Sequence, residues 1–299
     1  MSGVVLGAMA GIGFGLFQAV NRRVNAVIDV YRATFAVLTV GTVLLVLISA
    51  VTQDLGSLWT APAGALAAFA AAGFVHFFLG WTFLGLSQQR LGAARTGALL
   101  GSVPLVGALL AAAVLGEALT SRTLFALLVV VAGVVAISLR PRGARVAQGA
   151  PSSVSLPGLG FALGTTICWS VSPLLIRAGL ARFDEPLLGV TVGIAATTIA
   201  YGIAVAGARR TADGPLGRPL MGLLLIAGTL VGLSIWWQWL AYDLAPISVV
   251  LAVLQLSAPV VAIVSPLVSR DPLEHGGLLL WVGLALVLAG ALTFLLGGG

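Results

Sequence analysis

Long apolar runs alternate along the whole chain with short connections that hold arginine, glycine, proline and acidic residues. A helix needs about 20 apolar residues to cross the hydrocarbon core of a bilayer. Marking such runs predicts ten membrane-spanning helices, over residues 4–21, 31–51, 63–86, 93–113, 122–139, 157–178, 187–207, 219–240, 246–267 and 277–296. We therefore expect an all-α integral membrane protein with ten transmembrane helices.

The second half of the chain repeats the first. Matched positions lie 155 or, further on, 157 residues apart: Trp81 with Trp236, Gly73 with Gly228, Ser102 with Ser257, Pro104 with Pro259, and Glu117 with Glu274. Because each copy holds five spans, an odd number, the two copies must enter the membrane in opposite directions. We expect two inverted five-helix repeats, residues 1–139 and 157–299, joined by a linker loop at 140–156 that is rich in Arg, Gly, Pro and Ser.

Composition indicates lipid as the solvent for most of the surface. Apolar residues make up 60% of the chain and charged residues 8%, with a mean hydropathy of +1.13, which leaves too little polar surface to coat a globule. The fifteen basic residues are all Arg and lie mostly in connections, without the basic face of a nucleic-acid-binding protein. We therefore expect the lipid bilayer as a partner and no nucleic acid.

The chain offers no framework for a metal, a cofactor or enzymatic chemistry. Cys168 is the single cysteine and lies in an apolar run, where a buried packing thiol is the ordinary case. Spacings such as Gly-x-Ser-x-Gly and His-Glu-x-x-His do not occur, and there is no Lys for a phosphate-binding loop. We expect no cofactor, no metal site and no enzyme.

The arginines are distributed unequally between the two sides. Twelve follow odd-numbered spans, whereas only Arg122, Arg177 and Arg182 follow even-numbered spans. Under the positive-inside rule this asymmetry places the odd connections in the cytoplasm and both termini outside.

Polar residues inside the spans are costly in lipid and are the first candidates for function. Gln18 and Asn21 lie three positions apart on one helical face. His76 is the only histidine in a span; an imidazole there either couples transport to protons or hydrogen-bonds between helices. The candidate substrate-binding residues are Gln18, Asn21, His76, Trp81, Ser102, Pro104, Trp169, Trp236, Gln238, Gln255, Ser257 and Pro259.

The matched prolines and tryptophans are the most informative of these candidates. A proline inside a helix frees the carbonyl one turn back, so Pro104 and Pro259 either line a cavity or kink their helices for packing. Trp81 and Trp236, as a matched pair, suit the wall of a cavity for an organic solute with an apolar portion. Two further aromatic residues, Trp239 and Tyr242, are expected as anchors at the membrane interface.

The two matched glutamates do not form a catalytic pair, because they follow spans of opposite direction. We expect Glu117 and Glu274 each to cap the N-terminus of the helix that follows it, where the helix dipole favours a negative charge.

These motifs resemble the EamA-type repeat of the drug/metabolite transporter superfamily, most clearly in Gly80-Trp81-Thr82-Phe83-Leu84-Gly85-Leu86, Ser102-Val103-Pro104-Leu105 and Leu115-Gly116-Glu117-Ala118-Leu119-Thr120. The resemblance implies a ten-helix inverted repeat whose first, third, fourth, sixth, eighth and ninth helices line a central cavity. It implies cavity or gating roles for Trp81, Pro104, Trp236 and Pro259, and structural roles for Arg32 and Glu117. It also implies termini that face inward, which disagrees with the arginine asymmetry.

The leading hypothesis is a secondary transporter in the cell membrane that moves a small organic metabolite, such as an amino acid, by alternating access. Proton coupling, the direction of transport and the oligomeric state stay open. Two alternatives belong to other classes: a non-transporting membrane subunit that binds a partner through its glycine-rich faces, and a membrane-embedded enzyme or scaffold. The enzyme would need a cluster of ionisable residues at one interface, whereas the sequence shows scattered ones.

Overall fold

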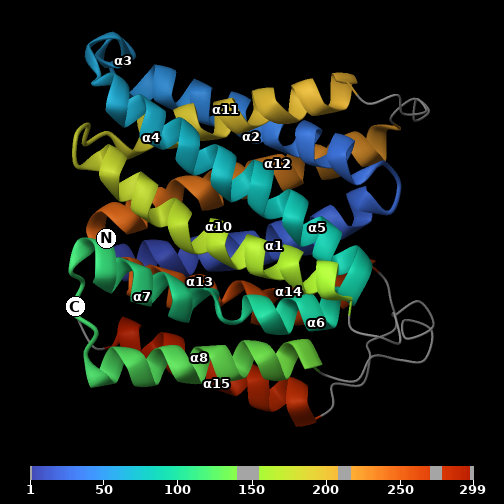
Figure 1. The fold of residues 1–299 in the computed structure, drawn as a ribbon. Helices are drawn as coiled ribbons and strands as arrows, with labels where there is room; N and C mark the ends of the chain where they lie inside the picture. Colours follow the sequence, from blue (N-terminus) through green and yellow to red (C-terminus); the bar gives the residue numbers. More distant parts are fainter. Residues whose placement is uncertain (1, 140–154, 208–216, 270–277, 297–299) are drawn as a thin grey trace.

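The computed structural model describes residues 2–139, 155–207, 217–269 and 278–296, and within these ranges the secondary structure is helical with no strand (Figure 1). Ten helical spans are long and apolar enough to cross a membrane, as predicted. Their elements are α1 (Gly3–Asn25), α2 (Val30–Thr52), α4 (Ala63–Gly73) with η1 (Phe74–Leu79) and α5 (Gly80–Leu91), α6 (Ala93–Leu100) with α7 (Val103–Leu115), α8 (Ser121–Leu139), α10 (Leu156–Leu180), α11 (Pro186–Gly207), α12 (Arg218–Leu244), α13 (Ile247–Leu254) with α14 (Ser257–Ser269), and α15 (Leu278–Leu295).

The predicted boundaries agree with the observed ones to within a few residues. The largest difference is in the third span, which continues to Leu91 rather than residue 86. A very short helix, α3 (Ser57–Thr60), lies in the connection that follows α2. The third and fourth spans are separated by Gly92, whose φ of 82° lies in a region that favours glycine.

The helices lie side by side, and both ends of the described chain lie at the same end of the bundle (Figure 1). We call this the terminal end, where α1 begins and α15 ends, and we call the other the opposite end. The helices α8 and α15 pack together along one edge of the bundle (Figure 1). They contribute most of a second hydrophobic cluster beside the main core.

Replacing each helix by its counterpart in the other half of the chain reproduces the main helix–helix contacts. The helix α1 packs against α12 and α14, and its counterpart α10 packs against α5 and α7. At the α8–α15 crossing, a Cβ on Gly133 would lie 2.8 Å from the Gly283 carbonyl oxygen, and a Cβ on Gly290 would lie 3.0 Å from that of Ala126. Gly133 matches Gly290 and Ala126 matches Gly283 in the repeat. These contacts support two repeats, while their inversion and the unit boundaries stay predictions.

Small residues on α1 allow the closest helix approach. A Cβ on Gly11 would lie 2.9 Å from the carbonyl oxygens of both Val253 and Leu254, which belong to backbone that cannot move away cheaply. Because lipid tails are as apolar as the side chains, helices in a membrane associate through such close packing. The glycine therefore brings α1 directly against the end of α13.

Two spans are interrupted at matched places. The fourth breaks at residues 101–102 between α6 and α7, and the ninth at residues 255–256 between α13 and α14. Pro104 and Pro259 lie in the first turn of the helix after each break, where a missing backbone N–H costs little. Gly101, Ser102 and Gln255 keep right-handed helical dihedrals, so each proline closely follows a local two-residue interruption of its span.

One expectation about the aromatic residues was wrong. Trp239 and Tyr242, predicted as interface anchors, are 2% and 0% exposed. Trp239 packs on Phe69, with ring centroids 5.7 Å apart. By contrast, Trp59 on the short α3 is 93% exposed.

Candidate functional site

The third span contains a π-helical segment that the sequence did not predict. The segment η1 holds His76 at its centre. In a π-helix the backbone bonds reach five residues back, so nearby carbonyls fall out of the α-helical register, and such segments are frequent at functional sites. Two of these carbonyls accept side-chain hydrogen bonds: Trp169 Nε1 donates to the His76 oxygen at 3.1 Å, and the Tyr201 hydroxyl donates to the Phe77 oxygen at 3.3 Å.

His76 is held by α10 on two sides. Its Nδ1 lies 2.7 Å from Ser172 Oγ, and its ring stacks on Trp169 with centroids 5.7 Å apart and an interplanar angle of 18°. Ser172 directly precedes Pro173, the proline inside α10. The structure therefore brings together two candidates predicted separately, His76 of the third span and Trp169 of the sixth.

Trp81 connects the third span to α1. Its ring stacks on Phe17 with centroids 5.7 Å apart and an interplanar angle of 15°, and it meets Phe77 edge-on at 5.3 Å. We call the Phe17–Trp81 pair the aromatic platform. Phe17 was missed by the sequence reasoning, because an aromatic residue in an apolar span carries no distinguishing signal.

The interrupted helices lie beside α1 and α10. The Ser170 hydroxyl of α10 donates to the Val103 carbonyl oxygen, next to the first break, at 3.4 Å. At the second break, a Cβ on Gly15 of α1 would lie 2.9 Å from the Ser257 carbonyl oxygen. Gly15 and Ser170 are matched positions in the repeat. The helix α1 therefore contacts the second break at the position that corresponds to the contact of α10 with the first.

The other predicted candidates are placed as follows. Ser102 donates to the Leu99 carbonyl oxygen at 2.6 Å, and Gln255 is the C-terminal residue of α13. Gln238 is 3% exposed, and its Nε2 donates to the Tyr242 hydroxyl at 3.2 Å, so its amide already bonds within its own helix. Trp236 is partly buried. These residues are not linked by any of the described contacts to the His76 or Trp81 groups.

Two amides of α1 remain. Gln18 is exposed, whereas Asn21 is partly buried and its Oδ1 is buried without a hydrogen-bond partner.

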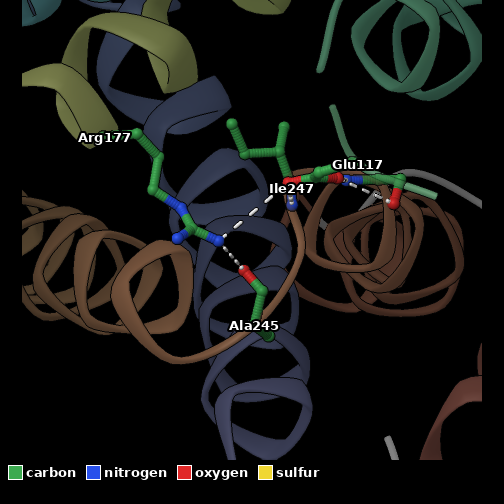
Figure 2. Close-up of polar contacts among 5 residues, drawn as sticks. Glu117, Arg177, Ala245 and Ile247 are labelled. Carbon is green, nitrogen blue, oxygen red and sulfur yellow. Dashed lines mark hydrogen bonds and ion pairs between the residues drawn. The ribbon is translucent and has the colours of Figure 1, made fainter. Parts of the chain in front are cut away.

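Glu117 joins the two halves at the terminal end (Figure 2). Its Oε1 accepts from the Ile247 N–H at 2.7 Å, and its Oε2 accepts from the Ser248 N–H at 3.3 Å and the Ser248 hydroxyl at 3.2 Å. Arg177 Nη2 lies 4.0 Å from Oε1 and donates to the Ala245 carbonyl oxygen at 2.9 Å. We call these five residues the Glu117 clamp.

The chain turns into the clamp at Gly116, whose φ of 70° ends α7 in the left-handed conformation. Glu117 therefore caps α13, and the expectation that it caps the following helix was wrong. The following helix α8 is instead capped by Thr120, whose Oγ1 accepts from the Thr123 N–H at 3.1 Å. Its repeat mate, Glu274, lies outside the described residues.

No group of three His, Cys, Asp or Glu residues able to hold a metal ion occurs in the ranges that the structure describes. The chemistry assembled here is hydrogen bonding and aromatic stacking between transmembrane helices.

Ten apolar spans in the described residues define the class, a multi-pass membrane protein. Residues 1–139, a little under half of the chain, match the model of the EamA-like transporter family, which is the family that the sequence motifs resemble. Among the solved structures that match, one crystal structure has a TM-score of 0.76 at 18% identity, covering 98% of this chain and 96% of that one, which shows a shared fold. No curated protein matches the chain.

Proposed function

We propose that the protein is a secondary transporter that moves a small organic metabolite across the cell membrane by alternating access. The observation that carries this proposal is the pair of broken helices, at residues 101–102 and 255–256. In transporters built from repeats, discontinuous helices in corresponding positions form the substrate site near the midplane. The His76–Trp169 group and the aromatic platform supply rings for an organic solute in the same bundle.

Alternating access requires the two halves to move against each other. We take these halves to be the units 1–139 and 157–299. The Glu117 clamp ties the first unit to α13 and α10 of the second at the terminal end. In the proposed cycle the clamp holds while the terminal end is closed and separates when that end opens.

His76 is the proposed site of proton coupling. Its Nδ1 lies 2.7 Å from the Ser172 hydroxyl. In the proposed coupling, neutral His76 carries its proton on Nε2 and Nδ1 accepts from Ser172, so protonation turns Nδ1 into a donor to Ser172 Oγ. This rearrangement lies where the third span meets α10, and it links protonation to helix contacts.

The test is flux of labelled amino acids and other metabolites in proteoliposomes, with and without an imposed pH gradient. We expect saturable flux that is lost in Trp81→Ala, because the aromatic platform is removed. Trp59→Ala is the matched control, since Trp59 is 93% exposed on α3 and should keep wild-type flux. Absence of flux for every solute, with folded protein in the liposomes, contradicts the proposal for those solutes.

A further inference from the structure

We propose that an amide stripe on α1, formed by Gln18, Asn21 and Asn25, is a binding site for the amino group of an amphipathic amine whose apolar part packs on the aromatic platform. The inference rests on the proposed function and names the substrate class. Asn25 was not among the residues singled out from the sequence.

The first observation is a pair of acceptors without donors. Only four buried side-chain polar atoms lack a hydrogen-bond partner in the described part of the chain, and two of them are Asn21 Oδ1 and Asn25 Oδ1. The residues lie four positions apart, so their side chains are neighbours on one face of α1. Buried polar groups in folded proteins nearly always have a partner, and two adjacent exceptions indicate a missing donor.

The second observation is the direction of the stripe. Ile12 is an exposed position of α1, at 45%. Asn21 follows it by nine residues, about two and a half turns, and therefore lies on the other side of the helix. Gln18 precedes Asn21 by three positions on the same stripe, yet it is exposed. The side of α1 that carries the amides is thus accessible at Gln18.

The third observation is an open space beside the aromatic platform. Phe17 lies one turn before Asn21 on α1 and stacks on Trp81. One turn beyond Trp81 lies Gly85, and a Cβ placed there would meet no atom within 4 Å. Since α1 and α5 both run toward the opposite end, Asn21 and Gly85 lie on the same side of the platform.

The amide oxygens of the stripe favour a ligand that donates hydrogen bonds. Amide oxygens accept hydrogen bonds from an ammonium group or an amine N–H, whereas a carboxylate would meet acceptors with no proton between them. Of the two neighbouring cations, Arg22 donates from Nη1 to Ser265 Oγ at 2.6 Å. Arg23 follows Ile12 by eleven residues, about three turns, and so lies on the Ile12 side of α1, away from the stripe. A solute with an amino group and a flat apolar part therefore fits this stripe better than an organic acid of the same size.

The test compares phenethylamine with 3-phenylpropionate, which has a similar ring and chain but a carboxylate. Dissociation constants are measured by calorimetry in detergent, with protein-free micelles as the blank. We expect phenethylamine to bind at least tenfold more tightly, and Asn21→Leu and Asn25→Leu each to weaken it at least tenfold. Gln88→Leu, which removes an exposed amide from α5, should leave the Kd unchanged.

Asn21→Asp distinguishes loss of the acceptor from loss of folding. This variant should bind phenethylamine more tightly, because an ionised acceptor bonds a cation more strongly, whereas a misfolded variant would bind it less tightly. Equal affinity for the two probes, no binding of either, or unchanged binding in the Asn variants overturns the inference. Flux separates the two proposals. Transport without any effect of the Asn variants leaves the carrier standing and removes the amine site. Binding that depends on the Asn residues, without flux of any solute, leaves the amine site standing and removes the carrier.

Discussion

Removing the charge of Glu117 should shift the protein toward opening at the terminal end. The carboxylate accepts three hydrogen bonds, two of them from backbone N–H groups in the first turn of α13. In Glu117→Gln the amide keeps one acceptor for Ile247 but turns an NH₂ group toward the Ser248 N–H. Hydrogen bonds to a charged group contribute about 1.5–3 kcal/mol, and a charge at a helix N-terminus somewhat less.

We therefore expect Glu117→Gln to weaken the clamp by about 2 kcal/mol. The Arg177 ion pair adds little to this figure, because its atoms are 4.0 Å apart and the Arg177 side chain is 32% exposed. If the clamp forms only when the terminal end is closed, a loss of about 2 kcal/mol raises the ratio of open to closed molecules about 30-fold.

The assay is electron–electron distance measurement between spin labels on Leu115→Cys and Leu244→Cys, in a Cys168→Ser background. Both positions are exposed at the terminal end, on α7 and α12. Glu117→Gln should move the distance distribution toward longer values, whereas Asp184→Asn, an exposed acid near the same end, should not. An unchanged distribution in Glu117→Gln would refute the assignment of the clamp as a closing contact.

Two further predictions concern packing and coupling. Gly11→Ala should lower the melting temperature, because its Cβ would lie 2.9 Å from the Leu254 carbonyl oxygen, whereas Gly160→Ala, with no atom within 4 Å, should be neutral or stabilising by up to about 1 kcal/mol. Equal effects would show that α1 does not depend on this approach. Ser172→Ala, which removes the partner of His76, should reduce the dependence of flux on the pH gradient as His76→Ala does, while flux down a solute gradient continues. Full gradient dependence in both variants would exclude the coupling role.

The candidate site was predictable only in part. Trp81, Pro104 and Pro259 stand out in the sequence because each has a repeat mate, and the structure places the prolines at helix breaks. The pairing of His76 with Ser172 was not predictable, since neither residue has a repeat mate of its own kind and the contact joins the third span to the sixth.

The ten spans follow from the sequence alone, because a chain in lipid must satisfy its backbone hydrogen bonds internally, and local apolar length then decides where helices cross. Which side of each helix faces its neighbours was decided by the tertiary structure. In water a hydrophobic face marks the core, but in a membrane lipid-facing and buried side chains are equally apolar. This is why the burial of Trp239 and the role of Phe17 escaped prediction. It is also why the partner of Glu117, a helix end 130 positions away, could be found only in the folded protein.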